Sequence, residues 1–184
     1  KNTVGAVYIV RDPRNVLTSL QNHFELNKDE ALKFMLSEKK YLYDYNQAND
    51  FSDFQFISSW EKNYNSWAKQ DIFPIKVIKY EELMNNTFET FKEIILFIEK
   101  ITKIKKIFIE SKAKNSIQST SFNKMKKIEQ SKGFNESVFS KNDSKKIPFF
   151  HLGPKNDWKK ILNEDFIKNA TLKFKPLLTE LNYI

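Results

Sequence analysis

An uninterrupted apolar stretch at residues 4–10 runs almost directly into a helix-start signal, and this junction limits the folds open to the chain. The stretch has the length of a strand and lacks the polar–apolar alternation of half-exposed strands. It therefore predicts a strand covered on both faces, as in a parallel sheet. Asp12 and Pro13 are residue types preferred at a helix N-cap and first helical position, so we expect a helix from there to about His23. A buried strand that leads straight into a helix predicts an α/β fold.

The rest of the sequence predicts more helices but only one more strand, at residues 75–80 after Pro74. Residues 111–150 are polar and predict a long loop or lid. Two strands are too few for a stable sheet, so we expect others upstream of Lys1 and interpret the chain as N-terminally truncated. Further helices are expected at 28–47, from Ser52 or Asp53 through Trp67, from an Asn86–Glu89 capping box onward, at 104–109, and from about Asn163.

Length and composition are those of one globular domain. The 184 residues, 40% of them hydrophobic, suffice for one core, so we expect a single domain over residues 1–184. No apolar run reaches the length of a membrane span, and no signal-peptide pattern precedes the first strand. The chain has no cysteine, which excludes disulfides and thiolate metal sites. We therefore expect a cytoplasmic protein without a metal site.

The arginines are confined to one short segment. A net charge of +8 favours an anionic partner, but of the 31 basic residues only Arg11 and Arg14 are arginines. Their planar guanidinium groups match phosphate oxygens two at a time. Arg11 ends the predicted strand, where open α/β sheets bind ligands, and Ser19 follows about two helical turns later. The spacing predicts that Arg11 and Ser19 converge on one anion; the alternative is a surface arginine and an ordinary helical serine.

This junction resembles the 3′-phosphate-binding motif of the sulfotransferases that use 3′-phosphoadenosine 5′-phosphosulfate (PAPS). The resemblance lies in an aromatic-aliphatic strand followed by Arg-(x)7-Ser. It implies a P-loop-NTPase-like architecture, with a parallel sheet flanked by helices, in which Arg11 and Ser19 hold the 3′-phosphate of the nucleotide. Arg14 matches a position that the family does not usually assign to the nucleotide, and we take it as a supporting residue.

Two later segments are similar to the parts of the family that surround the adenine. Tyr80 begins a Tyr-Glu-Glu-Leu stretch at the end of the second predicted strand, and the resemblance places it near the base. The alternative is a tyrosine that closes the strand over the core. Thr120 and Phe122 resemble the residues that flank the base on the other side.

Residues 149–159 are similar to the C-terminal phosphate loop of the family, which implies that His151, Leu152 and Gly153 contact the nucleotide. The family usually has an Arg-Lys pair where His151 and Leu152 stand, and a glycine where this chain has Asn156. Gly153 has no Cβ, so its backbone could approach an anion closely. A lone histidine such as His151 is more often a packing or surface residue.

The resemblance implies transfer of a sulfuryl group from PAPS to a hydroxyl or amine of a small-molecule or glycan acceptor. In the family the phosphate loop and the histidine base lie upstream of the arginine–serine motif, and no glycine or histidine of this chain occupies those places. We therefore assign no catalytic residue and expect the chain as given to be inactive. The acceptor-selecting segments correspond to residues 24–50 and 127–148, and neither carries a pattern that names a substrate.

Two other functions are compatible with parts of the sequence. A nucleotide kinase fragment would share the architecture but would need magnesium ligands. A basic module for nucleic acid or acidic lipid would use the net charge, yet the lysines are spread along the chain and largely balanced by 23 acidic residues. We therefore expect no nucleic-acid partner.

Overall fold

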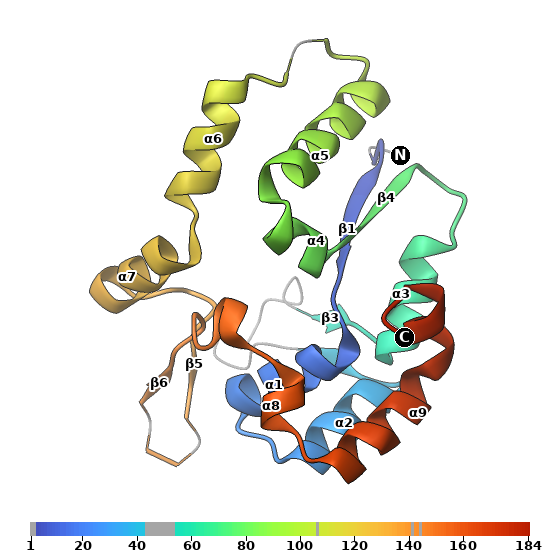
Figure 1. Cartoon of the computed structure of the whole chain (residues 1–184), viewed down its shortest axis with the longest axis vertical. Helices are drawn as coiled ribbons and strands as arrows, with labels where there is room; N and C mark the ends of the chain where they lie inside the picture. The colour runs from blue at the N-terminus through green and yellow to red at the C-terminus, as the bar shows by residue number, and fades with distance from the viewer. Residues whose placement is uncertain (1–2, 43–53, 106, 141, 144) are drawn as a thin grey trace.

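The computed structural model describes residues 3–42, 54–105, 107–140, 142–143 and 145–184. Its centre is a pair of parallel strands, β1 (Ala6–Val10) and β4 (Ile75–Lys79). They pair from Ala6 opposite Ile75 to Val10 opposite Lys79, so their carboxyl ends lie side by side. Helices surround this pair (Figure 1). The predicted α/β class, with a parallel sheet flanked by helices, is confirmed.

Helices make up most of the described chain. In Figure 1, α1, α2, α8 and α9 gather beyond the carboxyl end of β1, while α5 lies beside β4 and is followed by α6. Within the described residues no helix has both the length and the apolar character that a membrane crossing requires. The helices are α1 (Pro13–Phe24), α2 (Lys28–Leu36), α3 (Trp60–Ala68), α4 (Tyr80–Asn85), α5 (Thr87–Thr102), α6 (Glu110–Ser119), α7 (Phe122–Lys132), the 3₁₀ turn η2 (Gly153–Lys155), α8 (Trp158–Ile161) and α9 (Glu164–Glu180). Two short antiparallel pairs complete the secondary structure: β2 (Tyr41–Leu42) with β3 (Gln55–Phe56), and β5 (Val138–Phe139) with β6 (Lys146–Ile147).

The junction between β1 and α1 forms as predicted. Asp12 is the N-cap of α1, and its Oδ1 accepts a hydrogen bond from the backbone N–H of Arg14 at 2.9 Å. Pro13 occupies the first helical position and is fully buried. Because the cap and the proline both restrict the backbone, the direction in which α1 leaves the strand is well defined.

Helix α9 contributes most to the core. Its buried side chains recur at three- and four-residue steps, which is the pattern of one helix face. One cluster packs this face against Leu17 of α1 and Leu32 and Met35 of α2, and a second packs Leu177 against Val10 of β1. Burying each such side chain stabilises the fold by about 1.5–3 kcal/mol. Helix α9 therefore holds both the strand and the helix on either side of Arg11.

One predicted helix start is wrong, and one predicted capping box is absent. The helix expected from Ser52 or Asp53 begins at Trp60, because Ser59 supplies the N-cap, with its Oγ accepting from the N–H of Lys62 at 3.2 Å. Ser52 and Asp53 themselves lie outside the described residues. Helix α5 does begin after Asn86, but the Asn86 side chain makes no capping hydrogen bond. Asn86 also ends α4, where its N–H donates to the Glu82 carbonyl, and this double use fixes a backbone conformation unlike that of a free N-cap.

Of two other predicted helices, one is shorter than expected and one does not form among the described residues. The helix expected at 28–47 ends at Leu36, and Leu42 belongs to β2, while residues 43–47 lie outside the described part. No helix forms among the described residues of 104–109. There, Lys103 ends α5 in a left-handed conformation and the Phe108 N–H donates to Glu99 Oε1 at 2.8 Å, so the segment turns back along α5.

The prediction of a long loop at residues 111–150 is also wrong, because this segment contains α6, α7 and the β5–β6 hairpin. The buried residue of α6 is Ala113, and α7 has none. Without an apolar face, neither helix produces the periodicity by which helices are predicted from sequence.

Candidate functional site

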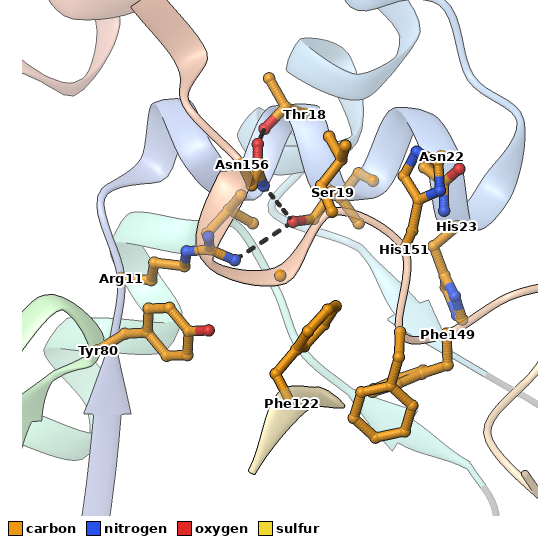
Figure 2. A pocket seen from close by; sticks show the side chains of 15 residues that line it. Arg11, Thr18, Ser19, Asn22, His23, Tyr80, Phe122, Phe149, His151 and Asn156 are labelled. Carbon is orange, nitrogen blue, oxygen red and sulfur yellow. Dashed lines mark hydrogen bonds between the residues drawn. The ribbon is translucent and has the colours of Figure 1, made fainter. Parts of the chain in front are cut away.

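The residues that follow the two central strands meet at their carboxyl ends. Arg11 follows β1 and Tyr80 follows β4, and the register of the strands sets them next to each other. The Arg11 guanidinium carbon lies 4.3 Å from the centre of the Tyr80 ring (Figure 2), a cation–π contact that fixes one face of the guanidinium. With that face covered, Nη1 of the guanidinium is directed toward Ser19 of α1.

Ser19 completes this arrangement from α1. Arg11 Nη1 donates to Ser19 Oγ over 3.4 Å, a long hydrogen bond between partly buried groups. Arg11 Nε is buried and has no hydrogen-bond partner among the described residues. A buried guanidinium N–H without an acceptor is costly, so this position fits an anion that would accept a hydrogen bond from Nε. The structure thus brings Arg11 and Ser19 into contact, and their binding of one shared anion stays a prediction.

Arg14 has a different environment and points away from this position. Its guanidinium forms an ion pair with Asp12 at 2.7 Å and lies 4.0 Å from the centre of the Trp158 ring. Only 4% of the residue is exposed. Arg14 thus uses its charge within the fold, which agrees with the supporting role expected from the sequence.

A cavity of about 480 Å³, called here the first cavity, opens beside Arg11 and Ser19 (Figure 2). A second cavity of about 1060 Å³ adjoins it. The two share Tyr80, Phe122, Phe150, His151 and Leu152 in their linings. Of the site residues predicted from the sequence, the structure places the following on the first cavity: Arg11, Ser19, Tyr80, Phe122, His151, Leu152 and Gly153. Thr120 lines the second cavity instead.

Phe122 and Gly153 are in direct contact at the boundary of the cavities. A Cβ on residue 153 would overlap the Phe122 ring, so the glycine is what lets the ring lie where it does. Gly153 also has a φ of 53°, in the left-handed region that other residues adopt at a cost. The space beside the Gly153 Cα is thus taken by an aromatic ring, while the approach of its backbone to an anion stays a prediction.

His151 and Leu152 lie on a segment that lines the first cavity together with α1. His151 is exposed, and Leu152 is half-buried. The segment is held by Glu129 of α7, whose carboxylate accepts from the N–H groups of Phe149 (2.7 Å) and Phe150 (3.0 Å). Desolvation raises the pKa of Glu129, but these hydrogen bonds and one from Ser137 outweigh it, and the pKa is lowered overall. The sequence analysis missed Glu129, because its partners are backbone groups about 20 residues away.

His23 and Asn156 also line the first cavity, and neither was predicted as a site residue. His23 lies one turn after Ser19 on α1. Burial lowers the pKa of His23, although the charge of Glu136 acts in the opposite direction. The lowered pKa favours the neutral imidazole. Asn156 is buried, and its Nδ2 donates to Ser19 Oγ at 2.9 Å. The one signal for Asn156 was its departure from the glycine of the family pattern.

In the part of the chain that the structure describes, no three or more His, Cys, Asp or Glu side chains come together in a way that could hold a metal ion.

Comparison with known proteins identifies one family. The model described as "Sulfotransferase domain" matches residues 1–182. A search of curated proteins found no match. Among solved structures, the chain is similar to a mouse sulfotransferase, SULT7A1, whose structure is described as complexed with PAP. The identity is 18% and the TM-score 0.47, and the match covers 95% of this chain and 57% of the mouse chain.

Proposed function

Because the chain belongs to the sulfotransferase domain family, we propose that it binds PAPS and takes part in transfer of the sulfuryl group to an acceptor hydroxyl or amine. When bound, PAPS supplies the activated sulfuryl group. The residues of this chain hold and orient the nucleotide. The acceptor that we propose is a small molecule or a glycan. The cytoplasmic location expected from the sequence stays a prediction.

The observation that carries this proposal is the partly unsatisfied guanidinium of Arg11 beside Ser19. A 3′-phosphate in the first cavity would accept from Arg11 Nε, which has no partner among the described residues. The Ser19 hydroxyl contacts the same guanidinium through Arg11 Nη1, and we propose that it donates to the same phosphate. Charge-assisted hydrogen bonds from a guanidinium are among the stronger polar contacts in proteins, and a dianionic phosphate would use them fully.

The second cavity is the proposed adenine site. Tyr80 and Phe122 line both cavities, so a nucleotide held by its phosphate at Arg11 would extend between these two rings. Thr120 lies on the far side, in the second cavity alone. Aromatic rings beside a phosphate site suit a planar base, because a base stacks on a ring without needing a specific hydrogen bond.

The proposal is tested by calorimetric titration with 3′-phosphoadenosine 5′-phosphate (PAP) and with AMP, which lacks the 3′-phosphate. We expect saturable binding of PAP in the presence of EDTA and at least about 10-fold weaker binding of AMP, because one charge-assisted contact contributes about 1.5–3 kcal/mol. Equal affinity for PAP and AMP would show that the chain has no site for the 3′-phosphate. Binding that requires Mg²⁺ would favour a kinase, and loss of all binding in moderate salt would favour a nonspecific basic surface.

Arg11→Lys should weaken PAP binding about 10- to 100-fold, because an ammonium group cannot present two parallel N–H donors to a phosphate. The matched control is a pair of neutral substitutions, Arg11→Gln and Lys168→Gln, each of which removes one positive charge. Lys168 is exposed on α9, away from both cavities, and its loss should change the affinity less than 2-fold if net charge contributes only weakly. Unchanged affinity in Arg11→Lys would exclude Arg11 from the site.

A further inference from the structure

We propose that Asn156 is a positioning residue for the anion site, holding the Ser19 hydroxyl as a hydrogen-bond donor toward the first cavity. The inference rests on the proposed nucleotide function, since it concerns the same site. Asn156 follows the η2 turn and lines the first cavity, yet only 8% of it is exposed. A buried amide must have its hydrogen bonds satisfied, and the partners of this one identify its role.

Among the described residues, the hydrogen bonds of the Asn156 side chain go to one face of α1, and Figure 2 shows those with Thr18 and Ser19. Its Nδ2 donates to Ser19 Oγ at 2.9 Å and to the Asn15 carbonyl at 3.1 Å. Its Oδ1 accepts from Thr18 Oγ1 at 2.6 Å. Residues 15, 18 and 19 share a helix face because they are three and four positions apart. The Asn156 side chain therefore fastens the loop after η2 to the turn of α1 that carries Ser19.

The Asn15 carbonyl fixes which way the Asn156 amide faces. If the amide were reversed, its oxygen would lie against the Asn15 carbonyl oxygen, and neither atom can donate. The orientation with Nδ2 toward Asn15 and Ser19 is thus the one that satisfies every group, with Oδ1 left for the Thr18 hydroxyl. Asn156 consequently presents a donor to Ser19.

This donor determines what the Ser19 hydroxyl can offer a ligand. A serine hydroxyl has one proton and two acceptor sites. Arg11 Nη1 and Asn156 Nδ2 both donate to it, so the acceptor sites are taken and the proton is free to be donated. In the structure that proton reaches the Asn15 carbonyl at 3.1 Å. This carbonyl also receives Asn156 Nδ2, so it stays hydrogen-bonded when Ser19 turns its proton toward an anion.

Two substitutions test the positioning role by calorimetry with PAP. Asn156→Ala removes the donor and should weaken binding about 10-fold, the scale of one hydrogen bond. Asn156→Asp keeps the shape but adds a carboxylate that takes the Ser19 proton and repels the ligand, and should weaken binding about 100-fold at pH 7.5. The native chain's affinity for PAP divided by that of Asn156→Asp should be several-fold smaller at pH 5.5 than at pH 7.5. The nearby anion raises the pKa of the introduced aspartate, and its protonated carboxyl can donate a hydrogen bond to Ser19 again. Taking the ratio at each pH cancels the titration of PAP itself.

A double-mutant cycle with Ser19→Ala separates positioning from general stability. If Asn156 acts through Ser19, adding Asn156→Ala to Ser19→Ala should cost less than 2-fold in affinity. Fully additive losses, or a pH-independent Asn156→Asp ratio, would overturn the proposal. The control is Asn163→Ala, which removes the cap that Asn163 Oδ1 gives the Phe166 N–H at 3.0 Å. It should lower the unfolding temperature without changing the affinity of the folded fraction.

Titration with inorganic phosphate distinguishes failure of this inference from failure of the proposed function. If the native chain binds phosphate but not PAP, and the Asn156 and Ser19 variants lose phosphate binding in the same pattern, the nucleotide assignment is wrong and the positioning role stands. If PAP binds and the cycle is additive, the function stands and the positioning role is wrong. If the native chain binds neither anion, both are wrong.

Discussion

The two arginines lie only three positions apart and use the same chemical group in opposite ways. Arg14 is surrounded by Asp12, the Trp158 ring and the Thr171 hydroxyl, which lies 3.4 Å from Nη1. Its partners come from both ends of the chain, so it ties α1 to α8 and α9. Arg11 has an aromatic ring on one face and an Nε without a partner in the described chain. A guanidinium with a carboxylate partner stabilises the fold, whereas one with an unused donor is available to a ligand.

At Gly153 the residue identity is set by a neighbouring ring. Gly153→Ala should lower stability by about 1–2 kcal/mol through the left-handed backbone and should also displace Phe122. Because Phe122 lines both cavities, PAP affinity should fall several-fold, as measured by titration.

The control for Gly153→Ala is Gly133→Ala. Gly133 has a φ of 78°, but a Cβ there would meet only the flexible end of Lys146. Both variants should show a lower unfolding temperature, and only Gly153→Ala should bind PAP more weakly. If both lost affinity equally, the effect would come from backbone strain, and the contact with Phe122 would not matter.

Among the secondary-structure elements, α7 is attached through the Phe122 ring, which contacts Phe150, and through the carboxylate of Glu129. The helix has no buried residue, and Glu129 connects it to the backbone of Phe149 and Phe150. The pKa of Glu129 is lowered in the folded chain from an ordinary value of 4.5. A carboxyl whose folded pKa is depressed contributes its full stability above its unfolded pKa, and this contribution is lost as the pH falls through the folded pKa.

Glu129→Gln should therefore lower the unfolding temperature at pH 7, and the difference from the native chain should shrink as the pH falls below about 4.5. A glutamine can accept from one of the two backbone N–H groups but not from both with equal strength. Thermal denaturation followed by circular dichroism over pH 3–7 measures this. Glu61→Gln, an exposed change on α3, should shift the unfolding temperature little at any pH. If the difference in unfolding temperature between Glu129→Gln and the native chain were the same at every pH, the Glu129 carboxylate would not have the stabilising role assigned to it.

The sequence predicted those elements whose own residues carry the signal. The apolar run of β1, the Asp12–Pro13 start of α1 and the apolar face of α9 are all local patterns, and the structure contains all three elements. Helices α6 and α7 were not predicted, because Ala113 is the buried residue of α6 and α7 has none. Their positions depend on contacts with neighbouring elements, such as that between α5 and α6, which leave no periodicity in the sequence.

The same distinction applies to the candidate site. Arg11 and Ser19 were predicted because eight residues of strand end and helix fix their separation. Glu129 and Asn156 were not, since a polar side chain that bonds to a distant backbone or hydroxyl group has no pattern of its own. The family resemblance located the segment around Asn156 but treated the residue only as a departure. Its function depends on the proximity of α1, which only the folded chain shows.

On the scale of the whole molecule, α9 connects the two hydrophobic clusters. Leu178 belongs to the first and is fully buried, while Leu177 belongs to the second. Leu178→Ala should reduce the free energy of unfolding by about 2–5 kcal/mol, the range for leucine truncation in a core. Urea denaturation measures it.

Leu172→Ala is the matched control on the same helix. Leu172 is 68% exposed, so its truncation should change the free energy of unfolding by less than about 0.5 kcal/mol. Similar effects of the two truncations would mean that α9 does not pack on α1 and α2 as described.

The hydrogen bonds that complete the cavity wall join distant parts of the polypeptide. Ser19 and Asn156 are 137 positions apart, and Thr18 and Asn156 are 138 positions apart. During translation, β1 and α1 leave the ribosome long before these partners are synthesised. A nascent chain therefore exposes Arg11 without the wall that Asn156 supplies, and translation must pass Asn156 before that wall can form. Ribosome-bound chains stalled at different lengths should therefore bind the nucleotide only when they extend beyond Asn156.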